Sequence, residues 1–185
     1  MPRRRRWQIV SNTQSDKIRV AGIINDSITD GPGLRLTVFL QGCDKNCPGC
    51  HNPSALTFED GTLYTAQEIM DKIKKNPMLS GVTFSGGEPL LQARALLPLA
   101  RMITDSGLDL AIYTGYTFEE LLDKGDNSQL ELLSLANVLI DGPFILEQRS
   151  LSLNFRGSAN QRILNIKESL AQGRAVLETN QSWTG

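Results

Sequence analysis

The segment Cys43-Asp44-Lys45-Asn46-Cys47-Pro48-Gly49-Cys50 contains all three cysteines of a chain of 185 residues. Cysteine thiolates are the usual protein ligands of iron–sulfur clusters, and four of them would occupy all four irons of a cubane. Three thiolates leave one iron without a protein ligand, where a small molecule can bind. The spacing therefore predicts a [4Fe-4S] cluster with one open iron, held by Cys43, Cys47 and Cys50.

The same segment also permits a zinc site, because His51 follows Cys50 directly and would complete a Cys3His ligand set. Structural zinc usually takes its ligands as two separate C-x2-C pairs, whereas the C-x3-C-x2-C spacing places every ligand in one loop. A zinc-binding interaction module without catalytic activity is therefore an alternative of a different class. A brown colour after oxygen-free purification would indicate an iron–sulfur cluster, and a colourless protein would indicate zinc.

The composition is that of an ordinary globular protein, with 40% hydrophobic and 21% charged residues. The length favours a single domain over residues 17–185, and the formal net charge of -1 suggests neither nucleic acid nor an anionic membrane as a partner. The run Arg3-Arg4-Arg5-Arg6 lies in a polar segment, residues 1–16, that we expect to be a flexible basic tail. No apolar run reaches the roughly 18 residues that a membrane helix needs. An odd number of clustered cysteines favours a reducing compartment, so we expect a cytoplasmic protein.

Hydrophobic patterns predict alternating strands and helices from Arg35 onward, which is typical of a parallel sheet with helices outside it. Strands are expected at residues 18–24, 35–40, 81–85, 108–114, 137–140 and 174–177. Helices are expected at residues 66–75, from residue 90 to Gly107, on either side of a turn at Asp126, and near residues 166–172. Pro98 does not suit a helix interior, so we expect a kink or break near Leu97.

A second motif, Ser85-Gly86-Gly87-Glu88-Pro89, stands at the end of one of these expected strands. Two glycines remove side chains, so the backbone can approach a ligand closely. The Glu88 carboxylate can accept hydrogen bonds from a cation such as an ammonium group. A plain strand-to-helix turn is the simpler interpretation, and the motif alone does not decide between the two.

Together, the cysteine segment and the Gly86-Gly87-Glu88-Pro89 motif at the next strand end resemble the radical S-adenosylmethionine (SAM) superfamily. The resemblance implies an incomplete (β/α) barrel of about five to six mostly parallel strands with helices outside. It also implies that the open iron of the [4Fe-4S] cluster binds the amino and carboxylate groups of SAM. The positions that match SAM-binding positions of the superfamily are Gly86, Gly87 and Glu88 at the methionine end, and Gly49, Cys50 and His51 near the adenine.

A narrower resemblance points to the activases of glycyl-radical enzymes, through Asp30-Gly31-Pro32-Gly33-Leu34-Arg35 just ahead of Phe39-Leu40-Gln41-Gly42-Cys43. Three later segments are similar to the activases of anaerobic ribonucleotide reductases: Tyr113-Thr114-Gly115-Tyr116, Val138-Leu139-Ile140-Asp141-Gly142 and Arg156-Gly157-Ser158-Ala159-Asn160-Gln161-Arg162. The likeness covers roughly residues 17–165.

This resemblance implies that a reduced cluster passes one electron to the sulfonium of SAM and releases a 5′-deoxyadenosyl radical, which removes a hydrogen atom from a glycine of the reductase. The implied partners are the large subunit of the anaerobic ribonucleotide reductase and a small electron-transfer protein of the flavodoxin or ferredoxin type. An activase of another glycyl-radical enzyme, or a radical SAM enzyme with a small-molecule substrate, is the alternative within the same chemistry.

Four further residues have roles that the resemblance implies less directly. Thr114 and Asp141 end two of the expected parallel strands, and matching positions in activases lie near the ribose or carboxylate of SAM. Some relatives carry a lysine two residues after that aspartate, where this chain has Pro143. Arg156 and Arg162 are expected either to bind a carboxylate or the partner, or to be exposed residues of a polar loop.

Overall fold

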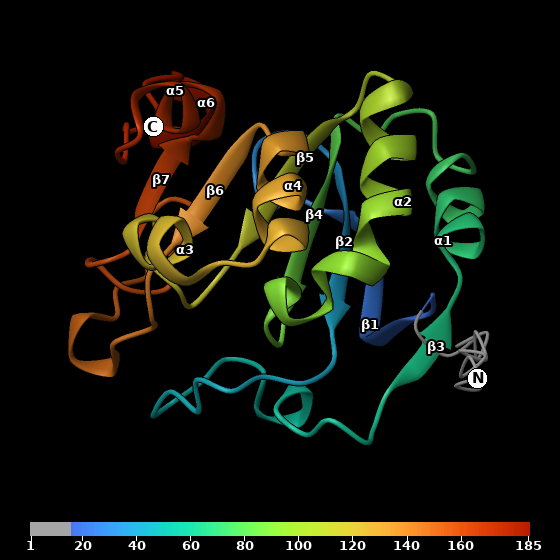
Figure 1. Cartoon of the computed structure of the whole chain (residues 1–185), viewed down its shortest axis with the longest axis horizontal. Helices are drawn as coiled ribbons and strands as arrows, with labels where there is room; N and C mark the ends of the chain where they lie inside the picture. Colours follow the sequence, from blue (N-terminus) through green and yellow to red (C-terminus); the bar gives the residue numbers. More distant parts are fainter. Residues whose placement is uncertain (1–15) are drawn as a thin grey trace, which may run out of the picture.

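The computed structural model describes residues 16–185, and the four arginines of the expected basic tail lie outside the described residues. The described strands form one seven-stranded sheet in the order β3-β1-β2-β4-β5-β6-β7 (Figure 1). The strands are β1 (Ile18–Ser27), β2 (Arg35–Leu40), β3 (Thr62–Tyr64), β4 (Gly81–Gly86), β5 (Asp109–Tyr113), β6 (Val138–Asp141) and β7 (Arg162–Asn165).

The four central strands β2, β4, β5 and β6 run parallel to one another. On one side β1 and β3 extend the sheet in antiparallel fashion, and on the other side β7 does the same. The edge strands β3 and β7 lie at opposite ends of the sheet and do not pair with each other, so the sheet is open like an incomplete barrel. The prediction of an α/β fold with a mostly parallel sheet is confirmed. The strand count exceeds the expectation because β3 and β7 have only three and four residues, too few to give a clear pattern.

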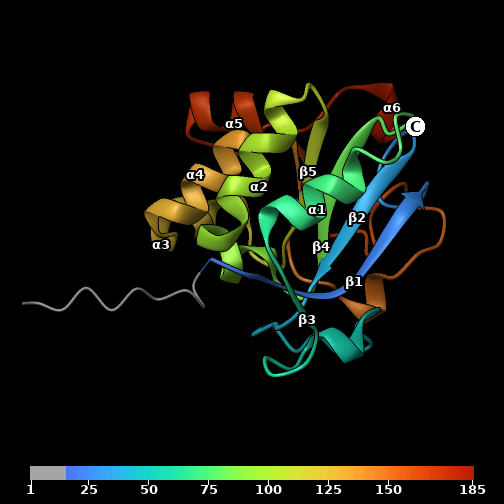
Figure 2. The same cartoon turned by 90° about the vertical axis from the view of Figure 1, so that its right-hand side faces the viewer.

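Helices cover one face of this sheet (Figure 2). They are α1 (Ala66–Ile73), α2 (Ala93–Asp105), α3 (Phe118–Lys124), α4 (Asn127–Leu135) and α5 (Ile166–Gln172). Because side chains alternate along a strand, each central strand divides its residues between two faces. Val38, Phe84 and Ile112 are fully buried in the large core under the helices. The neighbouring residues Phe39, Ser85 and Tyr113 face the other side, where they line a cavity.

The face away from the helices holds a smaller core and a buried polar network. The short helix α6 (Gln181–Thr184) lies on this side and inserts Trp183 among residues of β5, β6 and β7. The Arg35 guanidinium is 5.3 Å from the centroid of the Trp183 ring and donates to Asp109 Oδ1 at 2.6 Å and to Thr83 Oγ1 at 2.7 Å. A fully buried guanidinium is tolerated here because it has an ionic partner and hydrogen-bond acceptors.

The helix break expected near Leu97 is absent, while the alternative expectation of a kink there stays a prediction. Helix α2 runs unbroken from Ala93 to Asp105 with Pro98 inside it, preceded by the 3-10 turn η2 (Pro89–Gln92). Pro98 lies on the exposed side of the helix, while Leu96 and Leu99 are fully buried. Water can therefore satisfy the carbonyl that the proline ring leaves without a donor, and the buried leucines hold the helix on the sheet.

The expected last strand at residues 174–177 is also absent as a strand. This segment forms one isolated bridge, between Leu164 and Leu177. The Val176 carbonyl accepts from Asn165 N–H of β7 at 3.0 Å, but the Val176 N–H donates to the Ser169 hydroxyl of helix α5 at 2.9 Å, so the ladder does not continue. None of the helices between residues 16 and 185 combines the length and the hydropathy needed to span a membrane.

Candidate functional site

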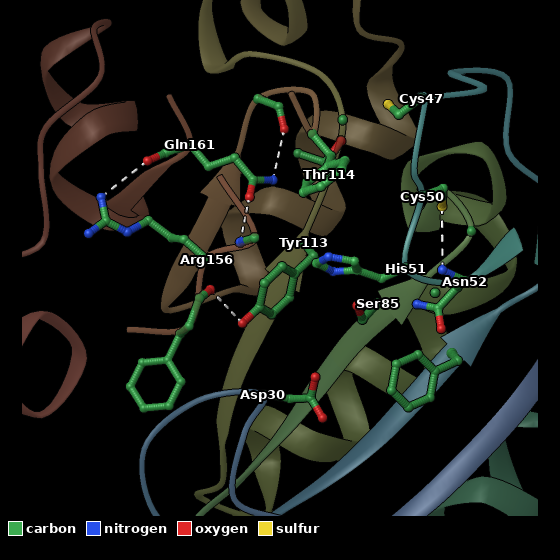
Figure 3. Close-up of a pocket in the computed structure, with 18 of the residues that line it drawn as sticks. Asp30, Cys47, Cys50, His51, Asn52, Ser85, Tyr113, Thr114, Arg156 and Gln161 are labelled. Carbon is green, nitrogen blue, oxygen red and sulfur yellow. Dashed lines mark hydrogen bonds between the residues drawn. The ribbon is translucent and has the colours of Figure 1, made fainter. Parts of the chain in front are cut away.

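A cavity of about 440 Å³ opens at the carboxyl ends of the parallel strands, on the face that the helices leave uncovered (Figure 3). Its volume falls within the usual range for small-molecule sites. The strands contribute Phe39, Ser85, Gly86 and Tyr113, and the loop after β2 contributes Cys47, Cys50, His51 and Asn52. The remaining wall comes mainly from the segment between β6 and β7, with Phe144, Leu153, Phe155, Arg156, Gly157 and Gln161. Parallel α/β sheets commonly bind ligands at this end.

The cysteine loop follows β2 directly and is fixed at its start by backbone hydrogen bonds. Gly42 N–H donates to the Ala55 carbonyl at 2.8 Å, and Cys43 N–H donates to the Leu56 carbonyl at 3.2 Å. All three thiols are free and half-buried, and Cys47 and Cys50 border the cavity. Burial, with further contributions from the Glu88 and Asp44 carboxylates, raises the pKa of the Cys43 thiol.

The three thiols do not converge on one point in this structure. Among the described residues, no three His, Cys, Asp or Glu side chains are gathered closely enough to hold a metal ion. The donor set nevertheless suits an iron–sulfur cluster, because it consists of three unpaired soft sulfur ligands on one loop beside a cavity. Cys43 is the one of the three that does not border the cavity.

The two motifs of the sequence are joined through backbone. Gly87 N–H donates to the Leu40 carbonyl at 2.7 Å, and Glu88 N–H donates to the Gly42 carbonyl at 2.8 Å. A Cβ on Gly87 would lie 2.4 Å from the Gly42 carbonyl oxygen, closer than real contacts allow. Gly86 has a φ of 96°, in the region that side chains disfavour. The glycines are therefore required by the close approach of the two segments, and both line the cavity.

Glu88 lies behind the cavity wall and is fully buried. Its Oε1 accepts from Leu90 N–H at 3.0 Å and from the Thr114 hydroxyl at 2.9 Å, and its Oε2 accepts from Gly115 N–H at 2.8 Å. Burial raises the pKa of this carboxyl to about 7, although the three donors oppose the shift. The carboxylate therefore connects the end of β4 to the end of β5, and it is not part of the cavity surface.

Thr114 and Asp141 occupy different environments. Thr114 borders the cavity through its place after β5. Asp141 is fully buried away from it, where Oδ2 accepts from Phe118 N–H at 2.8 Å and from Arg162 at 2.5 Å. Arg162 also pairs with Glu119 at 2.7 Å, and this pairing lowers the pKa of Glu119. Asp141 and Arg162 thus fix the start of α3 against β6 and β7.

The last two predicted residues flank Cys50. The His51 ring borders the cavity and packs against the Phe144 ring, with 4.7 Å between centroids. Gly49 has a φ of 70° and packs against Leu146, outside the cavity lining. The structure therefore gathers Cys47, Cys50, His51, Gly86, Gly87 and Thr114 around one cavity, and it places Cys43, Gly49, Glu88 and Asp141 behind or beside it.

Sequence reasoning missed the aromatic wall. Phe144 and Phe155 line the cavity from an irregular segment whose apolar residues follow neither a helix nor a strand period. Gln161 was singled out only as part of the segment Arg156-Gly157-Ser158-Ala159-Asn160-Gln161-Arg162. Its side-chain oxygen accepts from Gly157 N–H at 2.9 Å and its nitrogen donates to the Gly142 carbonyl at 3.1 Å.

Comparison with known proteins adds one family match, two relatives and one solved structure. Residues 29–164 match the family model described as a 4Fe-4S single cluster domain. The anaerobic ribonucleoside-triphosphate reductase-activating protein of Vibrio cholerae is 41% identical over 145 residues, which cover 74% of this chain and 90% of that protein. The pyruvate formate-lyase-activating enzyme of Clostridium pasteurianum is 38% identical over 133 residues, which cover 67% of this chain and 55% of that enzyme. Among solved structures, QueE from Escherichia coli has a TM-score of 0.44 and 18% identity, over 55% of this chain and 54% of its own.

Proposed function

Because the chain belongs to the family of the anaerobic ribonucleoside-triphosphate reductase-activating proteins, we propose that it generates a glycyl radical on the large subunit of an anaerobic ribonucleotide reductase. The observation that carries this proposal is a single cavity bordered by two cysteines of the C-x3-C-x2-C loop and by both glycines of the Gly86-Gly87-Glu88-Pro89 motif. The chain is thus a radical SAM activase of glycyl-radical enzymes, and the zinc-module alternative has no support from its relatives.

The cofactors are a [4Fe-4S] cluster and SAM. When bound, they supply a 5′-deoxyadenosyl radical that takes a hydrogen atom from a glycine Cα of the partner. Cys43, Cys47 and Cys50 would hold the cluster, and Cys47 and Cys50 already stand at the cavity edge. Gly86 and Gly87 would present bare backbone to the methionine end of SAM.

Other side chains in or behind the cavity wall exclude water, contact the ligand or position the end of β5. The rings of Phe39, Phe144 and Phe155 make part of the lining apolar and so exclude water from a reaction that water would intercept. His51, next to Cys50 and packed on Phe144, is positioned for the adenine. Glu88 holds Thr114 and Gly115 in place through two hydrogen bonds, so its contribution in this arrangement is to position the β5 end. Direct contact of Glu88 or Asp141 with SAM stays a prediction.

The partner would approach the face that the helices leave open, since the sheet is not closed there. A small protein of the flavodoxin or ferredoxin type would supply the electron, and neither nucleic acid nor a membrane is needed. Free thiols at the site fit a reducing compartment, which supports a cytoplasmic location. The continuous sheet and adjoining cores support a single domain over residues 17–185.

The decisive experiment combines the oxygen-free protein, reconstituted with iron and sulfide, with a reductant, SAM and the large subunit. An electron paramagnetic resonance doublet from a glycyl radical on that subunit would support the proposal. The relative that activates pyruvate formate-lyase makes another glycyl-radical enzyme the second candidate substrate, so that enzyme belongs in a parallel sample. Cleavage of SAM without a radical on either protein would favour a small-molecule substrate.

A further inference from the structure

We propose that Arg156 is the residue of this cavity that binds a carboxylate, contributed either by SAM or by the partner polypeptide. The inference rests on the function proposed above and extends it to the recognition of a ligand group. Figure 3 shows Arg156 on the side of the cavity away from Cys47 and Cys50.

The first observation is that the Arg156 guanidinium lacks an ionic partner among the described residues. Arg35 pairs with Asp109, and Arg162 pairs with Asp141 and Glu119. Arg156 donates one long hydrogen bond, from NH1 to the Gln161 carbonyl at 3.3 Å. Arg35 and Arg162 are therefore committed to the fold, and Arg156 is not.

The second observation is an unsatisfied donor. Arg156 Nε is shielded from solvent and has no hydrogen-bond partner within the described part of the chain. A buried guanidinium nitrogen without an acceptor is unfavourable, and such groups in folded proteins call for a specific explanation. The side chain as a whole is half-buried and borders the cavity.

The third observation is that the backbone around Arg156 is held in a defined conformation. The preceding residue, Phe155, has a φ of 49°, which is uncommon for a side-chain-bearing residue. Its carbonyl accepts from the Tyr113 hydroxyl at 2.8 Å, and its ring packs edge-on against Trp183. The residue that follows, Gly157, donates to the Gln161 side chain at 2.9 Å. Both neighbours are anchored, so the backbone of Arg156 is held in place beside the cavity.

The ligand class follows from guanidinium chemistry. A planar guanidinium with several free N–H groups matches a carboxylate, which it can bind through two parallel hydrogen bonds. Asp30 supplies the only carboxylate that residues 16–185 place on the cavity wall, and its Oδ2 already accepts from Ser27 Oγ at 2.5 Å and Thr37 Oγ1 at 3.1 Å. The carboxylate must therefore arrive with a ligand, and SAM and an acidic polypeptide segment are the two sources.

The test compares Arg156→Gln with Arg149→Gln, which removes the same charge at an exposed site in the same segment outside the cavity. Reconstituted proteins are assayed without turnover, for SAM affinity by anaerobic equilibrium dialysis and for affinity to the purified large subunit. We expect Arg156→Gln to weaken one of the two affinities by about tenfold or more, as the loss of a charge-assisted contact predicts. Arg149→Gln should match the wild type in both.

The affinity that falls identifies the source of the carboxylate. Weaker SAM binding assigns it to SAM, and weaker large-subunit binding with normal SAM binding assigns it to the partner. Arg156→Lys, which keeps the charge without the planar group, should lie between wild type and Arg156→Gln and serves as the second variant if Arg156→Gln folds poorly. Wild-type affinities in Arg156→Gln, with the wild type active, would overturn this inference alone. A wild type that binds neither ligand would overturn the proposed function as well.

Discussion

The Tyr116 hydroxyl donates a 2.6 Å hydrogen bond to Asp44 Oδ2. The Lys45 ammonium lies 3.4 Å from the centroid of the same ring. Asp44 and Lys45 belong to the cysteine loop, whereas Tyr116 follows β5, so one aromatic residue ties this loop to the neighbouring strand end. Burial and the hydrogen bond to Asp44 raise the pKa of Tyr116, which keeps the hydroxyl protonated as a donor.

Replacing Tyr116 with Phe should loosen the cysteine loop, because it removes this hydrogen bond and keeps the ring under Lys45. A hydrogen bond of this kind contributes about 1 kcal/mol, or roughly a fivefold change in an equilibrium. We expect the reconstituted variant to lose its cluster absorption several times faster in air. Tyr64→Phe is the matched control, since that ring belongs to β3 and faces Lys72 of α1. Equal rates in Tyr116→Phe and wild type would contradict this role.

Replacing Cys47 with Ala should abolish SAM cleavage, because two thiolates from one loop cannot hold a cubane stably. The measurements are iron and sulfide content after reconstitution, together with the release of 5′-deoxyadenosine. Thermal unfolding before reconstitution should be nearly unchanged, since Cys47 lies at the cavity edge and not in either core. Retained cleavage would refute the assignment of Cys47 as a ligand.

Glu88 should make stability depend on pH. Burial raises the pKa of its carboxyl to about 7, against about 4.3 in an unfolded chain. Between these values the folded state holds a proton that the unfolded chain has released. The contribution is therefore complete below about pH 4.3 and is lost as pH rises through about 7, a change of up to about 4 kcal/mol.

The substitution Glu88→Gln should remove that dependence, because the amide stays neutral. The free energy of unfolding in urea, measured at about pH 5 and about pH 8 before reconstitution, should fall more between the two in wild type than in the variant. A parallel pH dependence in both proteins would show that Glu88 titrates normally.

A methyl group on Gly87 should destabilise the protein. The new Cβ would lie 2.4 Å from the Gly42 carbonyl oxygen and 3.0 Å from the Ala55 carbonyl oxygen, so the cysteine loop must move. Overpacking of this kind costs about 1–3 kcal/mol. Gly22→Ala is the control, since no atom of residues 16–185, apart from the glycine and its chain neighbours, lies within 4 Å of the added Cβ. Thermal unfolding of the two variants gives the comparison, and equal melting temperatures would contradict the close approach.

Local sequence signals predicted most of the fold because they act at short range. The capping boxes that begin at Thr65 and Thr117 are both formed, and each starts a helix. The run from Arg35 to Leu40 is a strand with the expected bounds. The break expected near Pro98 is absent for a tertiary reason, because packing of the opposite helix face on the sheet leaves Pro98 on the exposed face.

The sequence motifs of the site could be predicted, whereas the other residues that line its cavity could not. The spacing of the cysteines and the paired glycines is a local property, and the structure brings Cys47, Cys50, Gly86 and Gly87 to one cavity. Whether Glu88 faces the cavity or the β5 end depends on Thr114 and Gly115, which are distant in sequence. Phe144 and Phe155 lie in an irregular segment, so no helix or strand periodicity in the sequence predicted that they line the cavity.

Trp183 links helix α6 to the cavity indirectly, because it packs against a residue of the cavity wall and is not itself part of that wall. Its ring packs against Phe155 on one side and lies near the Arg35 guanidinium on the other. Phe155 in turn precedes Arg156 and lines the cavity. Proteolytic trimming of α6, or an affinity tag that displaces it, would therefore disturb ligand recognition even though no removed residue belongs to the cavity wall.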